Sequence, residues 1–279
     1  RLLGLDAEQM ARAFGIAGTM AAGLKSQFGT DCKPFHAGRA TEAGLMAATM
    51  AARGFTSRSD ILDCEQGFAA THSKHFNPEA AVGDAPGGGF HVRNNLFKYH
   101  AACYLTHAAI ESGRQIRAEH APALDEVAAV SIQVEKGADR VCNIAEPATG
   151  LETKFSLRMT TAFALAGIDT AGMVNYTAAN ATDPRLTALR DRVQIDLASG
   201  ISATFSNVTV TLKDGTRLQA SHDSGIPAAD VGMQGKRIGA KFDALAKPVI
   251  GDNRSGALRA ALENIETAPS IAEIMQIAA

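Results

Sequence analysis

The sequence contains no tryptophan, few aromatic residues and no run of basic residues. Aromatic residues make up 5% of the 279 residues, so the chain offers few rings on which bases or sugars could stack. Lys and Arg total 27 and Asp and Glu total 29, which gives a net charge of −2. A near-balanced charge without a basic run argues against nucleic acid as a partner.

Long apolar runs and closely spaced cysteine pairs are missing as well. No apolar run reaches the roughly 18 residues that a membrane span needs, and Asp6 and Glu8 interrupt the first apolar residues, where a signal peptide would lie. The four cysteines lie far apart: Cys32, Cys64, Cys103 and Cys142. This spacing indicates free thiols in a reducing compartment. We therefore expect a cytoplasmic protein that does not associate with a membrane.

Helical patterns dominate the first part of the chain. Asp6-Ala7-Glu8-Gln9 resembles a capping box and precedes an apolar stripe at helical spacing. Further helices are predicted over residues 39–53 and about 98–113. The mixed stretch 57–97 is interpreted as a loop, and its Gly87-Gly88-Gly89 lacks the strand and helix that a phosphate loop or dinucleotide fingerprint requires. We expect no cofactor.

Strand patterns begin after Pro122. Val130, Ile132 and Val134 alternate with polar residues, which is typical of a half-buried strand, and residues 193–197 alternate again. A third strand leads into Asp214-Gly215, a hairpin turn signal, followed by a return strand.

The order of these patterns predicts an α+β fold. Helical patterns return beyond Ser221, where Ser270-Ile271-Ala272-Glu273 resembles a capping box. We expect a mainly helical domain, made of residues 1–122 and 223–279, which is interrupted by a smaller α+β domain at 123–222.

The first candidate site surrounds Lys33. Gly29, Pro34 and Gly38 predict a turn that presents Lys33 and His36, with Arg39 close behind, at the start of a helix. Backbone N–H groups and the helix dipole at such a position favour an anion. The alternative without a functional role is a solvated Lys33 beside a His36 that caps the helix.

The second candidate site lies in residues 98–107. If this segment is helical, His100, Cys103 and His107 share one face. Acid–base use of Lys98 and His107 is the favoured interpretation, with an ordinary packed helix face as the alternative. A zinc site needs a further ligand, because three ligands on one helix cannot close a tetrahedron, and only the cluster at His72 and His75 could supply one. We predict no metal.

Several passages, in order along the chain, resemble the 2-methylcitrate dehydratase (MmgE/PrpD) family, which also includes cis-aconitate decarboxylase and iminodisuccinate epimerase. They are Lys33-Pro34-Phe35-His36-Ala37-Gly38-Arg39-Ala40 with Gly54-Phe55-Thr56, Lys98-Tyr99 with Cys103 and Thr106-His107-Ala108-Ala109-Ile110, Lys154-Phe155-Ser156-Leu157, and Lys213-Asp214-Gly215. The resemblance implies a helical domain with an α+β lid, an active site between them, and a homodimer. It also implies a further helical N-terminal section, which we expect this chain to lack.

The resemblance assigns roles to individual residues. Lys33 and Lys98 match active-site lysines, and His107 or a group from the further section moves the proton. Position 103 can be a histidine in the decarboxylases but is Cys103 here, and position 159 is often a tyrosine near the substrate but is Met159 here. The remaining residues expected to bind substrate lie in the same matching passages: His36, Arg39 and Ser156.

The implied chemistry is proton removal from carbon next to a carboxylate of a small metabolite. This step needs a base and cations that hold the developing charge. A dehydratase of the 2-methylcitrate type is expected. The alternatives are an epimerase or decarboxylase of the same family and a non-catalytic protein that binds a dicarboxylate.

Overall fold

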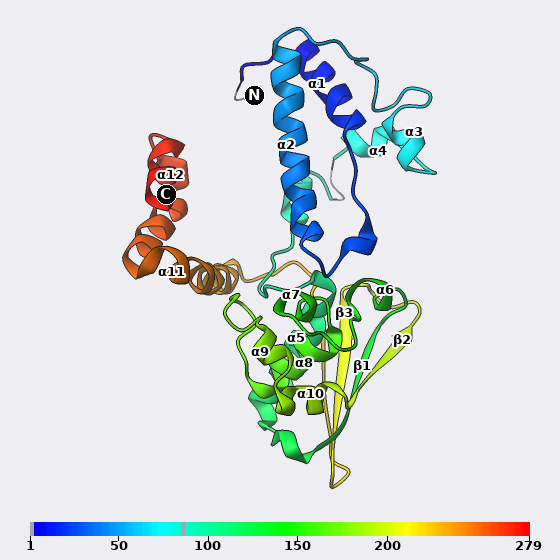
Figure 1. The fold of residues 1–279 in the computed structure, drawn as a ribbon, viewed down its shortest axis with the longest axis vertical. Coiled ribbons are helices and arrows are strands. Elements are labelled where there is room, and N and C mark those ends of the chain that lie inside the picture. The colour runs from blue at the N-terminus through cyan, green and yellow to red at the C-terminus, as the bar shows by residue number, and fades with distance from the viewer. Residues whose placement is uncertain (1–2, 85–86) are drawn as a thin grey trace. The chain divides into compact units, whose positions relative to one another are not determined.

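The computed structural model describes residues 3–84 and 87–279. Contacts divide the chain into two compact units, Arg1–Arg93 and Asn94–Ala279 (Figure 1). The described residues form many helices and one four-stranded mixed sheet, and the predicted α+β class is confirmed. No helix within the described ranges is long and apolar enough to cross a lipid bilayer.

The first unit is built on two packed helices. Its helical elements are α1 (Ala7–Thr19), η1 (Lys25–Gln27), α2 (Cys32–Ala52), α3 (Phe68–His72) and α4 (Pro78–Val82). Asp6 begins α1 with the predicted capping box, in which its side chain and that of Gln9 each accept a hydrogen bond from the other's backbone. The small core joins Ala13 and Ile16 of α1 to Ala47 and Ala51 of α2.

The prediction of a turn around Lys33 is wrong, because helix α2 already begins at Cys32. Pro34 lies in the first turn of α2, where a residue without an N–H can be accommodated. Lys33, His36 and Arg39 therefore project from a helix rather than from a turn. The stretch 57–97, expected to be a loop, also contains short helices.

The second unit contains the sheet and its covering helices (Figure 1). Before the sheet come η3 (Tyr104–Thr106), α5 (His107–His120) and η4 (Leu124–Glu126). The sheet consists of β1 (Val127–Glu135), β2 (Val193–Ala198), β3 (Phe205–Leu212) and β4 (Arg217–Asp223). Its strand order is β2-β1-β3-β4, with β1 and β2 parallel and the other pairs antiparallel.

Helices connect β1 to β2 and follow β4. The connection contains α6 (Asp139–Cys142), α7 (Gly150–Thr153), α8 (Leu157–Ala166), α9 (Ala178–Ala181) and α10 (Pro184–Arg190). After β4 come α11 (Val231–Glu263), η5 (Ile265–Thr267) and α12 (Ile271–Ala278). Gly251 interrupts α11 with φ 77° and ψ 164°, and the Ser270 side chain caps α12 by accepting from the Ala272 N–H.

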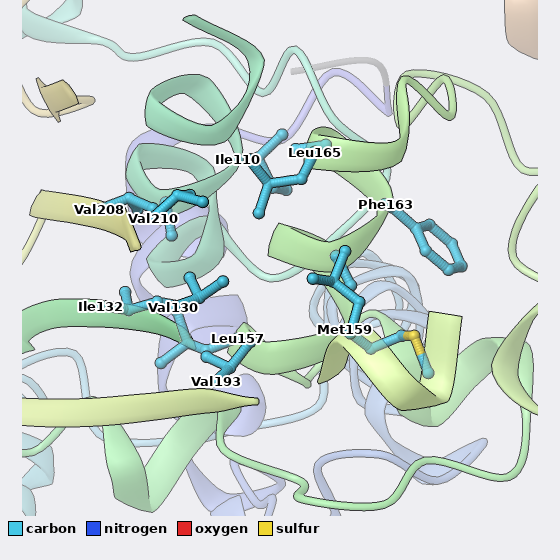
Figure 2. Packing of buried hydrophobic residues seen from close by; sticks show 14 of the residues in the cluster. Ile110, Val130, Ile132, Leu157, Met159, Phe163, Leu165, Val193, Val208 and Val210 are labelled. Atoms are coloured by element: carbon cyan, nitrogen blue, oxygen red, sulfur yellow. The ribbon is translucent and has the colours of Figure 1, made fainter. Parts of the chain in front are cut away.

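The core of this unit lies between the sheet and the pair α5 and α8. Figure 2 shows Val130 and Ile132 of β1 and Val208 and Val210 of β3 near Leu157 and Ile110. Helices α5 and α8 approach closely at Gly113, where an added Cβ would lie 3.0 Å from the Cβ of Ala164. This packing fixes α5, and hence His107 at its first turn.

Helix α5 packs within the second unit, where it contacts β3, β4 and α8. The grouping of 1–122 with 223–279, and the role of 123–222 as a lid, stay predictions.

Candidate active site

The segment before α5, which becomes helical only at η3, brings two histidines together. The α-helix predicted over 98–113 begins only at His107. The prediction that His100, Cys103 and His107 share one helix face is therefore wrong. Tertiary hydrogen bonds replace helical ones here: the Ala101 N–H donates to the Thr170 carbonyl at 2.8 Å and the Cys103 N–H to the Lys154 carbonyl at 2.8 Å. The rings of His100 and His107 still meet edge to face, with centroids 4.9 Å apart.

Both ring nitrogens of His100 are engaged. Thr170 Oγ1 lies 2.7 Å from Nδ1, and Glu111 Oε1 lies 2.8 Å from Nε2. Glu111 also pairs with Arg237 of α11, and the Arg237 guanidinium carbon lies 3.7 Å from the centroid of the Tyr99 ring. A chain of contacts therefore runs from Thr170 through His100 and Glu111 to α11.

The pKa values of Glu111 and His100 follow from burial and from neighbouring charges. Burial alone would raise the pKa of Glu111, but the hydrogen bond and charge of His100, together with Arg237, outweigh it and lower the pKa to about 2. Burial is also the largest influence on His100 and lowers its pKa despite the neighbouring Glu111. A neutral His100 then donates from Nε2 to an ionised Glu111 and accepts at Nδ1 from the Thr170 hydroxyl.

His107 differs from its neighbour, because one of its nitrogens has no partner in the described part of the chain. The residue is 2% exposed, and its Nε2 makes no hydrogen bond to any described residue. The residue lines a pocket of about 400 Å³, together with Tyr99, Tyr104, Glu111 and Arg237 and residues from the end of β4. A buried nitrogen without a partner, in a residue that lines a pocket, is a candidate contact for a ligand.

The surroundings of His107 keep it neutral. Burial is the main cause that lowers its pKa to about 3, followed by the charges of His100, Lys98 and Lys241. A hydrogen bond with the Ala102 backbone opposes this shift, and Lys98 Nζ donates to the Ala102 carbonyl at 3.1 Å. The structure thus brings together Lys98 and His107, two of the predicted catalytic residues.

Cys103, the third predicted catalytic residue in this unit, contacts another cysteine. A hydrogen bond with the Cys103 side chain, and then burial, raise the pKa of the Cys142 thiol. Ser156 and Met159, predicted to bind substrate, are both fully buried. The Ser156 side chain caps α8 by accepting from the Met159 N–H at 3.2 Å, and Met159 lies in the hydrophobic core. Neither residue lines the pocket beside His107.

The remaining predicted residues lie on α2 of the first unit. Lys33 is exposed, with Nζ 4.3 Å from the centroid of the Phe28 ring. His36 and Arg39 line a second pocket of about 530 Å³ together with residues of α1, and Arg39 forms an ion pair with Glu42. That Lys33 and Lys98 act on one substrate stays a prediction.

The described residues contain no ligand cluster for the alternative of a zinc site. Within residues 3–84 and 87–279, no group of three or more His, Cys, Asp or Glu side chains could hold a metal ion. His72 instead stacks on Phe68, with ring centroids 4.2 Å apart.

Sequence reasoning missed Glu111, Arg237 and Lys241. Glu111 follows His107 by one helical turn, and this spacing was a usable signal. Arg237 and Lys241 reach the site only because α11 packs beside it, and nothing in the local sequence marks them.

Comparison with known families covers both units. Residues 1–81 match the model of the MmgE/PrpD N-terminal domain, and residues 100–267 match that of the MmgE/PrpD C-terminal domain. A search of curated proteins found no match.

Proposed function

Because this chain belongs to the MmgE/PrpD family, we propose that it removes a proton α to a carboxylate of a small di- or tricarboxylate. Family membership indicates a lyase-type function. Within that class we propose a dehydratase of the 2-methylcitrate dehydratase type. An epimerase or decarboxylase of the same family is the alternative, since these reactions also pass through a carbanion-like centre.

The observation that carries the proposal is the unpartnered Nε2 of the buried His107. A general base needs a free lone pair within reach of the proton that it removes. Because the other nitrogen of His107 is engaged with the Ala102 backbone, the lone pair at Nε2 is available. The pocket beside His107 has a volume of about 400 Å³, which is sufficient for a small carboxylate metabolite.

A pKa of about 3 is too low for an efficient base near neutral pH. Two of its causes are the positive charges of Lys98 and Lys241. A bound polycarboxylate offsets these charges, so substrate binding raises the pKa of His107 toward the working range. The base thereby becomes effective when the substrate is present.

The proposed reaction has two steps. His107 Nε2 accepts the α-proton, and the electron pair left on carbon delocalises into the adjacent carboxylate, whose developing charge is stabilised by the Lys98 ammonium. The β-hydroxyl group then departs with the proton returned from Nε2, so that water leaves, a carbon–carbon double bond forms and His107 is neutral again.

The family resemblance supports further parts of the proposal. Lys33 binds a second region of the substrate, with His36 and Arg39 near it, and Cys103 lies beside the reacting centre. Ser156 and Met159 support the site indirectly, through the cap of α8 and the hydrophobic core. We further propose that residues 123–222 act as a lid and that the protein works as a homodimer.

Hydrogen–deuterium exchange tests the function directly. The full chain is incubated in D₂O with 2-methylcitrate, cis-aconitate or iminodisuccinate, and proton NMR follows loss of the α-proton signal and formation of product. We expect exchange or water loss with at least one of them, and 2-methylcitrate is the expected substrate. Absence of both with all three compounds would contradict the enzyme and favour a binding protein.

A further inference from the structure

Lys241 of α11 is a half-buried lysine beside the candidate active site. Its Nζ donates a hydrogen bond to the backbone carbonyl of Lys98 at 2.5 Å. Burial, and then the charge of Lys98, lower the pKa of Lys241. Lys241 also contributes to the low pKa of His107. Two ammonium groups and a neutral imidazole therefore share one neighbourhood.

The positive charges of Lys98 and Lys241 are not matched by neighbouring carboxylates among the described residues. Arg237 is offset by Glu111, with which it forms an ion pair. Neither Lys98 nor Lys241 forms an ion pair with a carboxylate in the described part of the chain, while other lysines, such as Lys213 and Lys247, do. Two like charges in a partly desolvated site repel each other, and an anionic ligand relieves that repulsion.

The unused hydrogen-bond donors of the two lysines also favour an anionic ligand. An ammonium group has three donors. One donor of Lys98 is used by the Ala102 carbonyl and one donor of Lys241 by the Lys98 carbonyl. The remaining donors of both lysines are free to bind carboxylate oxygens, and charge-assisted hydrogen bonds of this kind are the strong ones.

We propose that Lys241 is a substrate-binding residue that, together with Lys98, selects ligands carrying at least two carboxylates. The inference rests on the proposed function, which it deepens by naming the group that recognises the second carboxylate. Neither the local sequence nor the family-related motifs assign a role to Lys241.

The test compares two unreactive ligands by isothermal titration calorimetry. Tricarballylate carries three carboxylates and butyrate carries one. We expect Lys241→Met to weaken tricarballylate binding by about 10- to 100-fold, as expected for loss of a charge-assisted hydrogen bond. Butyrate binding should change far less, so the ratio of the two dissociation constants falls. Lys241→Arg should restore part of the affinity for tricarballylate.

Lys236→Met is the matched control. Lys236 is exposed on the same helix, so its replacement removes the same charge without touching the site. We expect this variant to bind tricarballylate like the unmodified protein. Thermal unfolding of all variants checks that each is folded.

The outcomes separate the two proposals. If Lys241→Met is folded and keeps the unmodified ratio of dissociation constants, the role of Lys241 is overturned while the proposed function stands. An equal loss for both ligands also overturns it, because that pattern indicates a structural role. If the unmodified protein binds neither tricarballylate nor butyrate and turns over none of the candidate substrates, the proposed function fails and the inference fails with it.

Discussion

His100 and His107 lie edge to face with their ring centroids 4.9 Å apart, yet only His100 has a hydrogen-bond partner at both nitrogens. Thr170 and Glu111 fix the first ring in place. The second ring belongs to a residue that lines a pocket, and its Nε2 has no partner among the described residues. Two adjacent imidazoles of the same residue type therefore differ in what they can do: one organises the site and the other can accept a proton.

The Glu111→Gln variant tests the organising role. The Glu111 carboxylate joins His100 to Arg237, and its side chain is 16% exposed. Loss of its charge leaves the partly buried Arg237 over Tyr99 without a counter-ion, so we expect the free energy of unfolding to fall by about 2–3 kcal/mol. Urea denaturation of both proteins measures the change.

Glu119→Gln is the control for this comparison. Glu119 is exposed near the end of the same helix and accepts a hydrogen bond from Gln115. A surface change of this type is expected to shift stability by less than about 0.5 kcal/mol. Equal effects of the two substitutions would show that the link from Glu111 to Arg237 contributes nothing.

Stability should fall as the pH is lowered below about 6.5. The folded state holds the pKa of His107 at about 3, against an ordinary value of 6.5, so only the unfolded chain takes up this proton between these values. By linkage, stability is fully present above pH 6.5 and is lost toward pH 3. His100, whose pKa is also lowered, adds to the loss. Glu111, with a pKa of about 2 against 4.5, adds to it only below about pH 4.5.

The His107→Gln variant isolates the share of this residue. Between about pH 7 and about pH 5, His107 should account for about 2 kcal/mol of the lost stability. Urea denaturation at both pH values should therefore show a smaller drop for the variant than for the unmodified protein. An unchanged drop would mean that His107 is not held neutral by the fold.

Local patterns predicted much of the fold correctly. The capping box at Asp6, the alternation over 130–134 and the hairpin signal Asp214-Gly215 each depend on residues close in sequence. The same reasoning failed over 98–103, since the Cys103 N–H bonds to the distant Lys154 carbonyl rather than within a helix. Non-local hydrogen bonds overrode the helical pattern there.

The site was only partly predictable for the same reason. Lys98 and His107 stood out because cationic and imidazole groups recur within one short segment. Arg237 and Lys241 lie on α11, far along the chain, and only tertiary packing brings them to that segment. Met159 was singled out by the resemblance alone, and the structure places it in the core.

Lys33→Ala tests the part of the proposal that rests on the family resemblance. If Lys33 binds a substrate carboxylate whose charge grows in the transition state, its loss should lower kcat/KM by about 10²- to 10³-fold. Steady-state turnover of 2-methylcitrate measures the effect. Lys25→Ala is the control, because Lys25 is also exposed in the first unit and lies outside the matching motif. Full turnover by Lys33→Ala would remove Lys33 from the scheme.

The most direct test of the account is the rate of α-proton exchange in D₂O, followed by proton NMR for the unmodified protein and for His107→Gln. His120→Gln, an exposed change at the end of the same helix, is the control. Loss of a general base predicts exchange that is slower by about 10²- to 10⁴-fold in His107→Gln and unchanged in His120→Gln. A folded His107→Gln protein that exchanges the α-proton at the unmodified rate would contradict the claim that His107 is the base.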